Sequence, residues 1–354
     1  MPGSNARPLP EQDLGHILEH TQGLWEDLRG ARLFVTGGTA FFGRWMLESF
    51  LKANDDFQLG AEATVLTRDP ARFAAAAPHV VGHPAVTLHA GDVRTFSFPE
   101  AECTHVLHMA TEAGPGMSPL ASFRTAVEGT ERVLSFAGLR GTRKLLVTSS
   151  GAVYGTQPPD LERVSEEYIG GPRPEDAARG YGHGKRAAEY LCSVAAATTD
   201  LEVKIARCFA FVGPLLPLDE DYAIGNFFGD ALNGDRVLVK GDGTARRSYL
   251  YASDLAIWLW TILVRGESGR PYNVGSEQDI NISDLARLVA RIVRPGVHVR
   301  VAQEALPGVP PTRYVPSTAR SASELGLREW VLLDDAVRRT ANWYLQGPPP
   351  EGGR

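Results

Sequence analysis

The sequence predicts an α/β protein in which a doubly wound parallel sheet carries helices on both faces and a smaller α/β lobe follows it. Three observations lead to this prediction. Short apolar runs typical of buried strands recur over the first half of the chain, segments of helical periodicity separate them, and a glycine-rich turn follows the first run. A chain of 354 residues is long enough to bury a substantial core around such a sheet.

An amphipathic segment opens the chain. Between residues 10 and 28, apolar side chains such as Leu14, Ile17 and Leu18 recur with helical spacing. We therefore expect residues 1–30 to form a helical extension that packs on the following domain or on a partner subunit. The segment lacks the order of basic region, apolar run and cleavage site that marks a signal peptide, so we predict none.

The first strand and the turn after it indicate a nucleotide cradle. The apolar run 31–35 leads into Thr-Gly-Gly-Thr-Ala-Phe-Phe-Gly at 36–43, and a helical pattern follows. Gly37 and Gly43 allow the backbone to turn sharply and to approach a pyrophosphate, whose charge the helix N-terminus stabilises. Ala40 stands where the middle glycine of such a motif is expected. An ordinary loop between strand and helix is the alternative interpretation.

A second strand candidate, 63–66, ends just before Arg68. A dinucleotide fold places the residue that reads the adenosine ribose at this distance along the chain. The guanidinium of Arg68 suits a 2′-phosphate, which favours NADP over NAD as the cofactor. A solvated loop charge and a group stacked on adenine are the alternatives for this residue.

Further strand candidates support a parallel sheet. Apolar runs at 86–90, 105–108 and 144–147 alternate with helical segments such as 126–139. Ligands of such sheets gather at the carboxyl ends of the strands, so a dinucleotide should lie against the loops that follow these runs. Asp92, in one of these loops, is a candidate acceptor for an adenine amino group, and a capping or loop aspartate is the alternative.

Tyr181 and Lys185 form a candidate proton-transfer pair. Residues four apart on a helix lie one turn above each other on the same face, so the ammonium of Lys185 can lie beside the phenol of Tyr181. A close cation favours the phenolate, which would let the pair act as a general base or acid near neutral pH. The spacing alone is common by chance, and its weight comes from the nucleotide cradle upstream.

Taken together, these motifs resemble those of the extended short-chain dehydrogenases/reductases, the NAD-dependent epimerase/dehydratase family whose members modify nucleotide sugars. The matching segments follow the family's order over nearly all of the chain. They are 36–43, 91–93, 149–155, 181–185, 207–214, 241–243 with Arg247, and Arg313.

The resemblance implies an organisation of the chain. We expect a Rossmann-type NAD(P)-binding domain over residues 31–213 and a mainly substrate-binding lobe over 214–345. The chain should return to the sheet near 236–251. Residues 346–354, rich in proline and glycine, are expected to be a disordered tail. The resemblance also implies a homodimer.

The resemblance further implies residue roles. Tyr181 is the catalytic acid or base, Lys185 binds the nicotinamide ribose and lowers the pKa of the tyrosine, and Ser150 hydrogen-bonds the reacting sugar oxygen. The cofactor site would be formed by Gly37, Thr39, Phe41, Phe42, Gly43, Arg68, Asp92, Val93, Met109, Ala110, Thr111, Thr148, Ser149, Tyr181, Lys185 and Cys208.

The predicted substrate site contains two arginines and one asparagine that stands in for a residue of the relatives. Arg247 and Arg313 match the arginines that grip the nucleotide diphosphate in relatives, and guanidinium groups bind phosphate oxygens in pairs of parallel hydrogen bonds. Arg246 is the rival of Arg247, whereas we interpret Arg320 as a helix-surface residue. Where many relatives carry a diphosphate-binding asparagine this chain has an alanine at 210, and Asn226 is the candidate replacement.

Departures from the family pattern narrow the chemistry. Dehydratases of the family carry an aspartate and a glutamate after the site serine or threonine, whereas Gly151 and Ala152 follow Ser150 here. Elimination would therefore need a carboxylate from elsewhere, with Glu112, Glu166 and Glu167 as candidates.

The predicted reaction is hydride transfer at C4 of a nucleotide-linked hexose. A 4-epimerase and a 4-ketoreductase remain as equal alternatives, and a 4,6-dehydratase with a relocated carboxylate is third. A catalytically silent NAD(P)-binding regulator is an alternative of another class, although such proteins usually lose the tyrosine or lysine that this chain keeps.

The composition argues against several classes of partner and site. The formal net charge is −6 without a block of basic residues, which argues against a nucleic-acid partner, and no apolar run approaches a membrane span. Cys103, Cys192 and Cys208 are scattered, which indicates a reducing, cytoplasmic location without disulfides. Neither the cysteines nor the nine histidines suggest a metal site, so we expect none.

Overall fold

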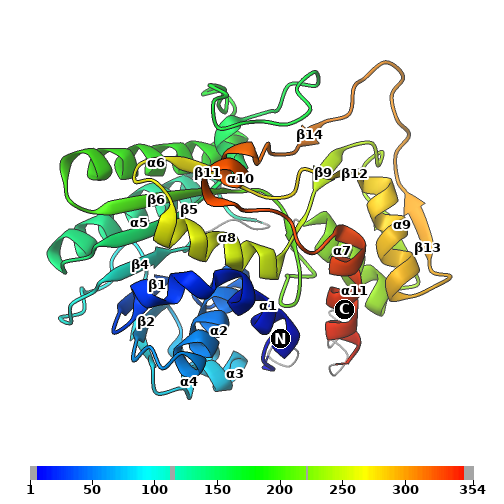
Figure 1. Ribbon diagram of the computed structural model, residues 1–354. Helices are drawn as coiled ribbons and strands as arrows, with labels where there is room; N and C mark the ends of the chain where they lie inside the picture. Colours follow the sequence, from blue (N-terminus) through cyan, green and yellow to red (C-terminus); the bar gives the residue numbers. More distant parts are fainter. Residues whose placement is uncertain (1–5, 112–115, 221, 347–354) are drawn as a thin grey trace.

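A seven-stranded parallel sheet forms the centre of the molecule (Figure 1). The structure is a computed structural model that describes residues 6–111, 116–220 and 222–346. Neighbouring strands follow the order β11-β6-β5-β4-β1-β2-β3, and every pairing among them is parallel. The strands are β1 (Arg32–Thr36), β2 (Glu62–Thr67), β3 (Val86–Ala90), β4 (His105–His108), β5 (Lys144–Ser150), β6 (Glu202–Cys208) and β11 (Pro271–Val274).

The strands in the middle of the sheet are buried almost without interruption. All four residues of β4 are buried, as are the last four of β1 and the last six of β5. A strand covered by helices on both faces reads as such a continuous apolar run. The predicted doubly wound α/β fold is confirmed, and its strand order reverses between β1 and β4.

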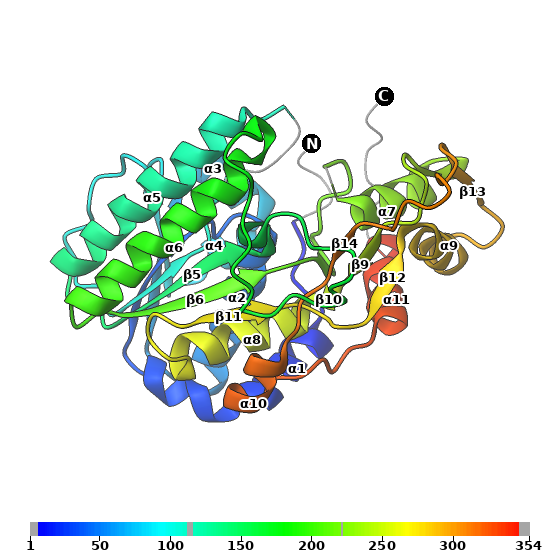
Figure 2. The same cartoon turned by 90° about the horizontal axis from the view of Figure 1, so that it is seen from above.

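Helices cover both faces of the sheet (Figure 2). Two long helices, α5 (Pro119–Leu139) and α6 (Gly180–Thr198), pack together on one face. On the other face lie α2 (Phe41–Asp56) and α8 (Ala252–Arg265), and α8 is buried over most of its length. Two short helices, α3 (Pro70–Ala76) and α4 (Pro78–Val81), lie between β2 and β3. No helix in the described part of the chain is long and apolar enough to span a membrane.

A smaller lobe stands beside the carboxyl ends of the strands (Figure 1). Its sheets pair β8 with β13, β7 with β10, and β9 with both β12 and β14. The lobe elements are β7 (Phe211–Val212), α7 (Ala223–Asn233), β8 (Arg236–Val239), β9 (Arg246–Ser248), β10 (Leu250–Tyr251), β12 (Asp279–Asn281), α9 (Ile282–Val293), β13 (His298–Val301), β14 (Arg313–Tyr314) and α11 (Leu333–Leu345). Helix α10 (Ala319–Leu325) instead packs on β11 and α8 of the large domain.

The chain returns to the large sheet later than predicted. The expected return at 236–251 is wrong, because β8, β9 and β10 all belong to small sheets and the strand that joins the large sheet is β11. Burial explains the difference. Exposed and buried residues alternate in β8, as suits a strand with one solvated face, whereas β11 has three consecutive buried residues.

The described amino-terminal extension is helical between residues 11 and 28 and connects the two parts of the molecule. It consists of α1 (Glu11–Thr21) and the 3-10 helix η1 (Gln22–Leu28), and it packs on α8. The buried carboxylate of Asp13 accepts hydrogen bonds from the hydroxyl of Tyr251 at 2.6 Å and from Arg339 of α11 at 2.8 Å. The extension therefore holds α11 of the lobe against the helix layer of the sheet.

The glycine-rich turn brings three backbone segments into close contact. Gly37 has a φ of +73°, in the left-handed region that favours glycine. A Cβ atom at Gly43 would lie 2.2 Å from the carbonyl oxygen of Gly37, so the first turn of α2 packs directly on the turn before it. Neither position tolerates a side chain without backbone movement.

We expect Gly43→Ala to destabilise the protein by about 1–3 kcal/mol, because the added methyl group meets rigid backbone. Gly15→Ala is the matched control, since Gly15 lies inside α1 with open space around its Cβ position. That variant should be more stable by about 0.5–1 kcal/mol, because alanine has the higher helix propensity. Urea unfolding of both variants measures the difference. Equal effects would contradict the close packing of the turn.

Candidate active site

The carboxyl ends of β1 and β4 are joined by a buried polar cluster. The Oγ1 atom of Thr36 accepts a hydrogen bond from the amide of Ala110 at 3.1 Å and lies 2.8 Å from Nδ1 of His108. The other ring nitrogen of His108 lies 3.0 Å from Oγ1 of Thr130 on α5. Burial lowers the pKa of His108 to about 3, so this imidazole is neutral and acts as a rigid spacer.

The predicted cradle fits a dinucleotide. A Cβ atom at Gly37 would lie 2.5 Å from the backbone of Met109, so the loops after β1 and β4 approach each other as closely as backbones can. Helix α2 begins at Phe41, and no side chain caps its N-terminus. Its first amides would therefore hold the diphosphate of a dinucleotide.

The adenosine end of the predicted site contains Asp92 and Arg68. The carboxylate of Asp92 accepts a hydrogen bond from Nε of Arg94 at 2.9 Å, and Arg94, with a further contribution from Arg68, holds the pKa of Asp92 below its usual range. Arg68 is exposed on the loop after β2. The roles of Arg68 and Asp92 in cofactor binding stay predictions.

Helix α6 carries the predicted proton-transfer pair on the face toward the sheet. The Nζ atom of Lys185 is buried, donates to the carbonyl oxygen of Thr148 at 2.8 Å and lies 5.8 Å from the centre of the Tyr181 ring. Burial lowers the pKa of Lys185 to about 8. This contact joins α6 to the carboxyl-terminal end of β5.

The electrostatics of Tyr181 differ from the expectation. Burial raises the pKa of Tyr181, and hydrogen bonds with Ser150 and Thr111 oppose the rise. The predicted lowering by Lys185 is not seen here, because the ammonium group is directed at the Thr148 carbonyl rather than at the phenol oxygen. Tyr181 therefore rests as a neutral phenol, ready to donate a hydrogen bond to an oxygen at this place.

Ser150 brings a second tyrosine into the site. Its Oγ atom accepts a hydrogen bond from the amide of Ala152 at 3.1 Å and lies 3.4 Å from the hydroxyl of Tyr314 on β14. The ring of Tyr314 packs on Phe209 with 4.7 Å between ring centres, and burial raises the pKa of Tyr314. No sequence motif marks Tyr314, although strand alternation places it on the face opposite its neighbour Arg313.

The space beside Gly151 is filled. A Cβ atom at this position would lie 2.7 Å from the Tyr314 hydroxyl and 2.7 Å from Cε1 of Phe209. A carboxylate side chain at 151, as dehydratases of the family carry there, would collide with both rings. The departure from the dehydratase pattern therefore extends from the sequence to the packing around it.

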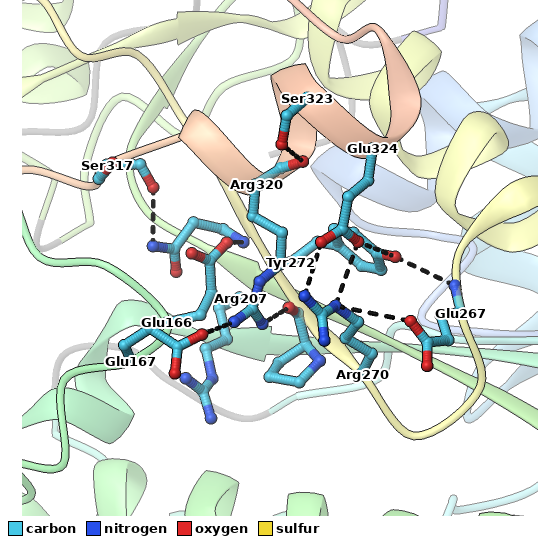
Figure 3. Close-up of polar contacts among 12 residues, drawn as sticks. Glu166, Glu167, Arg207, Glu267, Arg270, Tyr272, Ser317, Arg320, Ser323 and Glu324 are labelled. Carbon is cyan, nitrogen blue, oxygen red and sulfur yellow. Dashed lines mark hydrogen bonds and ion pairs between the residues drawn. The ribbon is translucent and has the colours of Figure 1, made fainter.

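Two of the carboxylates considered as replacements are engaged elsewhere. Glu166 accepts from the backbone amide of Asn273 at 2.7 Å, and Glu167 forms an ion pair with Arg320 of α10 (Figure 3). Arg320 also donates to the carbonyl oxygen of Pro271 at 2.8 Å, and only 11% of its side chain is exposed. The interpretation of Arg320 as a surface residue is wrong, because it joins α10 to β11. Glu112 lies outside the described residues.

The two predicted phosphate-binding arginines lie on opposite faces of a small sheet. Arg313 is 2.9 Å from Asp279, which also pairs with Arg246 of the adjacent strand. Arg247 follows Arg246 and therefore faces the other way, beside Tyr314. Its guanidinium donates to the carbonyl oxygens of Arg246 and Thr312 at 2.8 and 3.3 Å, and no described carboxylate pairs with it. Burial lowers the pKa of Arg247, as expected for a cation lacking an anionic partner.

The remaining predicted site residues lie near the same sheet edge or on α7. Cys208 ends β6, and burial raises its pKa to about 12, so the thiol stays protonated. Ser149 donates a hydrogen bond to Glu189 of α6. Asn226 is half-buried on α7. The substrate role of Asn226 stays a prediction.

Comparison with known proteins assigns the family. Residues 33–275 match the sequence model of the NAD dependent epimerase/dehydratase family. The chain belongs to this family of enzymes, and the predicted resemblance is confirmed.

Relatives within the family include several decarboxylases. UDP-glucuronic acid decarboxylase 1 of Xenopus tropicalis is 29% identical over 316 residues, which cover 88% of this chain and 72% of that protein. UDP-glucuronic acid decarboxylase 6 of Arabidopsis thaliana is 28% identical over 309 residues, 86% of either chain.

Solved structures of the family share the fold. DesIV, a dTDP-glucose 4,6-dehydratase from Streptomyces venezuelae solved with NAD and TYD bound, superposes with a TM-score of 0.75 at 25% identity, covering 89% of this chain and 97% of that one. A UDP-galactose 4-epimerase superposes with a TM-score of 0.71 at 22% identity, covering 89% and 99%.

The buried ammonium of Lys185 gives a test of the site by pH. The folded chain releases this proton near pH 8, whereas the unfolded chain holds it up to about its ordinary pKa of 10.5. Raising the pH above 8 therefore favours the folded state. Relative to Lys185→Met, the wild-type free energy of unfolding should increase by up to about 1.4 kcal/mol per pH unit between pH 8 and 10.

Urea unfolding of both proteins at pH 7, 8, 9 and 10 measures this difference. Buried cysteines titrate in both proteins and cancel in the comparison to first order. Stability curves that run parallel over this pH range would contradict a strongly desolvated ammonium at Lys185.

Proposed function

We propose that this enzyme oxidises C4 of a nucleotide-linked sugar with a tightly held NAD and returns the hydride to the same sugar. The observation that carries the proposal is the convergence of Tyr181, Ser150 and Tyr314 at the carboxyl end of β5, beside the dinucleotide cradle. NAD is preferred to NADP because the matching family is NAD-dependent and the related DesIV structure contains NAD. The preference for NADP based on Arg68 has no such support.

Each residue has a role in handling the oxygen at C4. Tyr181 is a base only as its phenolate, so the resting phenol must first lose its proton. The phenolate then takes the hydroxyl proton as the carbonyl forms, and the phenol gives it back when the carbonyl is reduced. The Ser150 hydroxyl lies 3.4 Å from the Tyr314 hydroxyl. These two hydroxyls donate hydrogen bonds to the C4 oxygen and so stabilise the negative charge that develops on it. Bound NAD supplies the hydride acceptor. Lys185 orients this arrangement through the Thr148 carbonyl.

Arg247 supports an anionic substrate. Its guanidinium lies on the same face of the small sheet as Tyr314, it is partly buried, and no described carboxylate neutralises it. A diphosphate or a sugar carboxylate bound here would provide the missing negative charge through two parallel hydrogen bonds. Arg313 and Arg246 share Asp279 on the other face, which leaves Arg247 as the better candidate.

Decarboxylation of a nucleotide-linked hexuronic acid is the outcome we favour. Oxidation at C4 turns the C5 carboxylate into a β-keto acid, which loses CO2 as the bond electrons move into the C4 carbonyl. A proton then returns to C5, and the hydride returns to C4. This sequence needs no acid for a leaving hydroxyl, which agrees with Gly151 and Ala152 in the dehydratase positions and with the named decarboxylase relatives.

Epimerisation at C4 is the second candidate. It requires only Tyr181, Ser150 and the hydride carrier, because the oxidised sugar rotates in the site and receives the hydride on its other face. The absence of side-chain carboxylates at 151 and 152 is equally compatible with this reaction. The two outcomes differ in the presence of a carboxylate on the sugar.

The reaction is tested with purified protein and a panel of UDP- and dTDP-linked hexoses and hexuronic acids. We expect NAD to be released on denaturation, and a hexuronic acid to lose CO2 without added cofactor. Tyr181→Phe should lower kcat by about 10²–10⁴-fold while substrate still binds. Interconversion of hexose isomers would instead establish the epimerase. Dependence on added NADPH, loss of water, or full activity of the variant would contradict the proposal.

The role of Arg247 is tested by substitution. Arg247→Ala should raise KM for the nucleotide sugar by about 10- to 100-fold, because charge-assisted hydrogen bonds of about 1.5–3 kcal/mol are lost. Arg246→Ala is the control, since Asp279 keeps Arg313 as its partner. Steady-state kinetics on the substrate found above measure both. A larger effect of the Arg246 variant would contradict the assignment of faces.

A further inference from the structure

A cluster of metal-binding side chains lies on helix α1, away from the active site. His16, Glu19 and His20 each offer a ligand atom, and these atoms all lie within 4.8 Å of one another. The two histidines are four residues apart, so both project from one face of the helix, and their ring centres are 4.6 Å apart. The expectation of no metal site overlooked this spacing.

Both imidazoles are held in place by neighbours from other elements. Nε2 of His16 lies 3.3 Å from Oδ1 of Asp254, whose side chain is fully buried at the start of α8. The other oxygen of Asp254 accepts from the backbone amides of Trp330 and Val331 at 2.8 and 3.0 Å. The ring of His20 stacks on Trp330 with 4.6 Å between centres. Neither ring is a freely rotating surface side chain.

The contact between His16 and Asp254 has the form of a support for a metal ligand. Metal-bound imidazoles usually donate their second ring N–H to a carboxylate, which fixes the ring and raises the basicity of the free nitrogen. With Nε2 of His16 engaged by Asp254, Nδ1 remains for an ion.

The surroundings carry an excess of negative charge. Glu19 is exposed at the edge of the cluster, and the fully buried carboxylate of Asp254 lies behind it. Arg328, 5.7 Å from the centre of the Trp330 ring, is the nearby cation that the described contacts place here. A divalent cation would balance this charge better than the side chains do alone.

We propose that His16, Glu19 and His20 bind a divalent transition-metal ion such as zinc. Two imidazole nitrogens and one carboxylate oxygen are a ligand set that Zn²⁺ accepts, with a fourth position left for water. Ligand atoms around a tetrahedral zinc lie about 3.3–3.6 Å apart. The ligand atoms of the three residues now lie within 4.8 Å of one another, so binding an ion would draw them closer together, and Glu19 is the exposed member of the three. The ion would join α1 to α8 through Asp254.

Metal binding is measured on the full chain without an affinity tag, after treatment with a chelator, by calorimetric titration with zinc chloride. We expect one equivalent to bind. His20→Phe keeps an aromatic ring against Trp330 but removes a ligand, and it should weaken binding at least about 100-fold. Glu19→Gln, at an exposed helix position, should weaken it less. His298→Phe, at an exposed histidine of β13, is the control and should bind as wild type does.

The melting temperature is a second measurement, which distinguishes zinc binding at this site from the general affinity of histidines for zinc. Zinc should raise the melting temperature of the wild type and of His298→Phe, and leave that of His20→Phe unchanged, because only a ligand that prefers the folded state stabilises it. Binding that survives in His20→Phe, or a wild type that takes up no zinc equivalent, would overturn the proposal.

Discussion

The buried ion pair between Glu189 of α6 and Arg207 of β6 fixes the geometry on which the active site depends. Only 12% and 15% of these side chains are exposed, and Arg207 donates to both carboxylate oxygens. Ser149 of β5 donates to the same carboxylate. Because Glu189 lies one turn beyond Lys185 and two beyond Tyr181, the pair sets the rotation of α6 and aims the tyrosine at Ser150.

The fold was largely predictable because its determinants are local in sequence. Strand periodicity, the glycine turn and the spacing of Tyr181 and Lys185 each appear within one short segment. The place of Tyr314 in the site, and the face of the small sheet on which Arg247 lies, could not be predicted from the sequence. Both depend on the pairing of β9 with β14, strands of three and two residues that are far apart in the chain. Such short strands carry almost no periodicity, so their partners follow from the tertiary fold.

Packing around Gly151 connects the active-site chemistry to the lobe. The rings of Phe209 and Tyr314 occupy the volume that a carboxylate at 151 would need, and Tyr314 arrives from β14 of the lobe. A carboxylate introduced at 151 would therefore require the lobe strand to move as well. Packing thus links the small residue at 151 to the presence of Tyr314 beside it, and oxygen handling at C4 is the chemistry common to all candidate reactions.

The position of the lobe relative to the sheet thus matters for chemistry, and the amino-terminal helix helps to set it. Through Asp13, α1 contacts Tyr251 before α8 and Arg339 of α11, while His16 contacts Asp254 in the first turn of α8. Tyr251 lies four residues beyond Arg247 in the chain, so these contacts of α1 lie close to the strand that carries the Arg247 guanidinium. A metal bound by His16, Glu19 and His20 would add a further constraint on α1, the helix that contacts both α8 and α11.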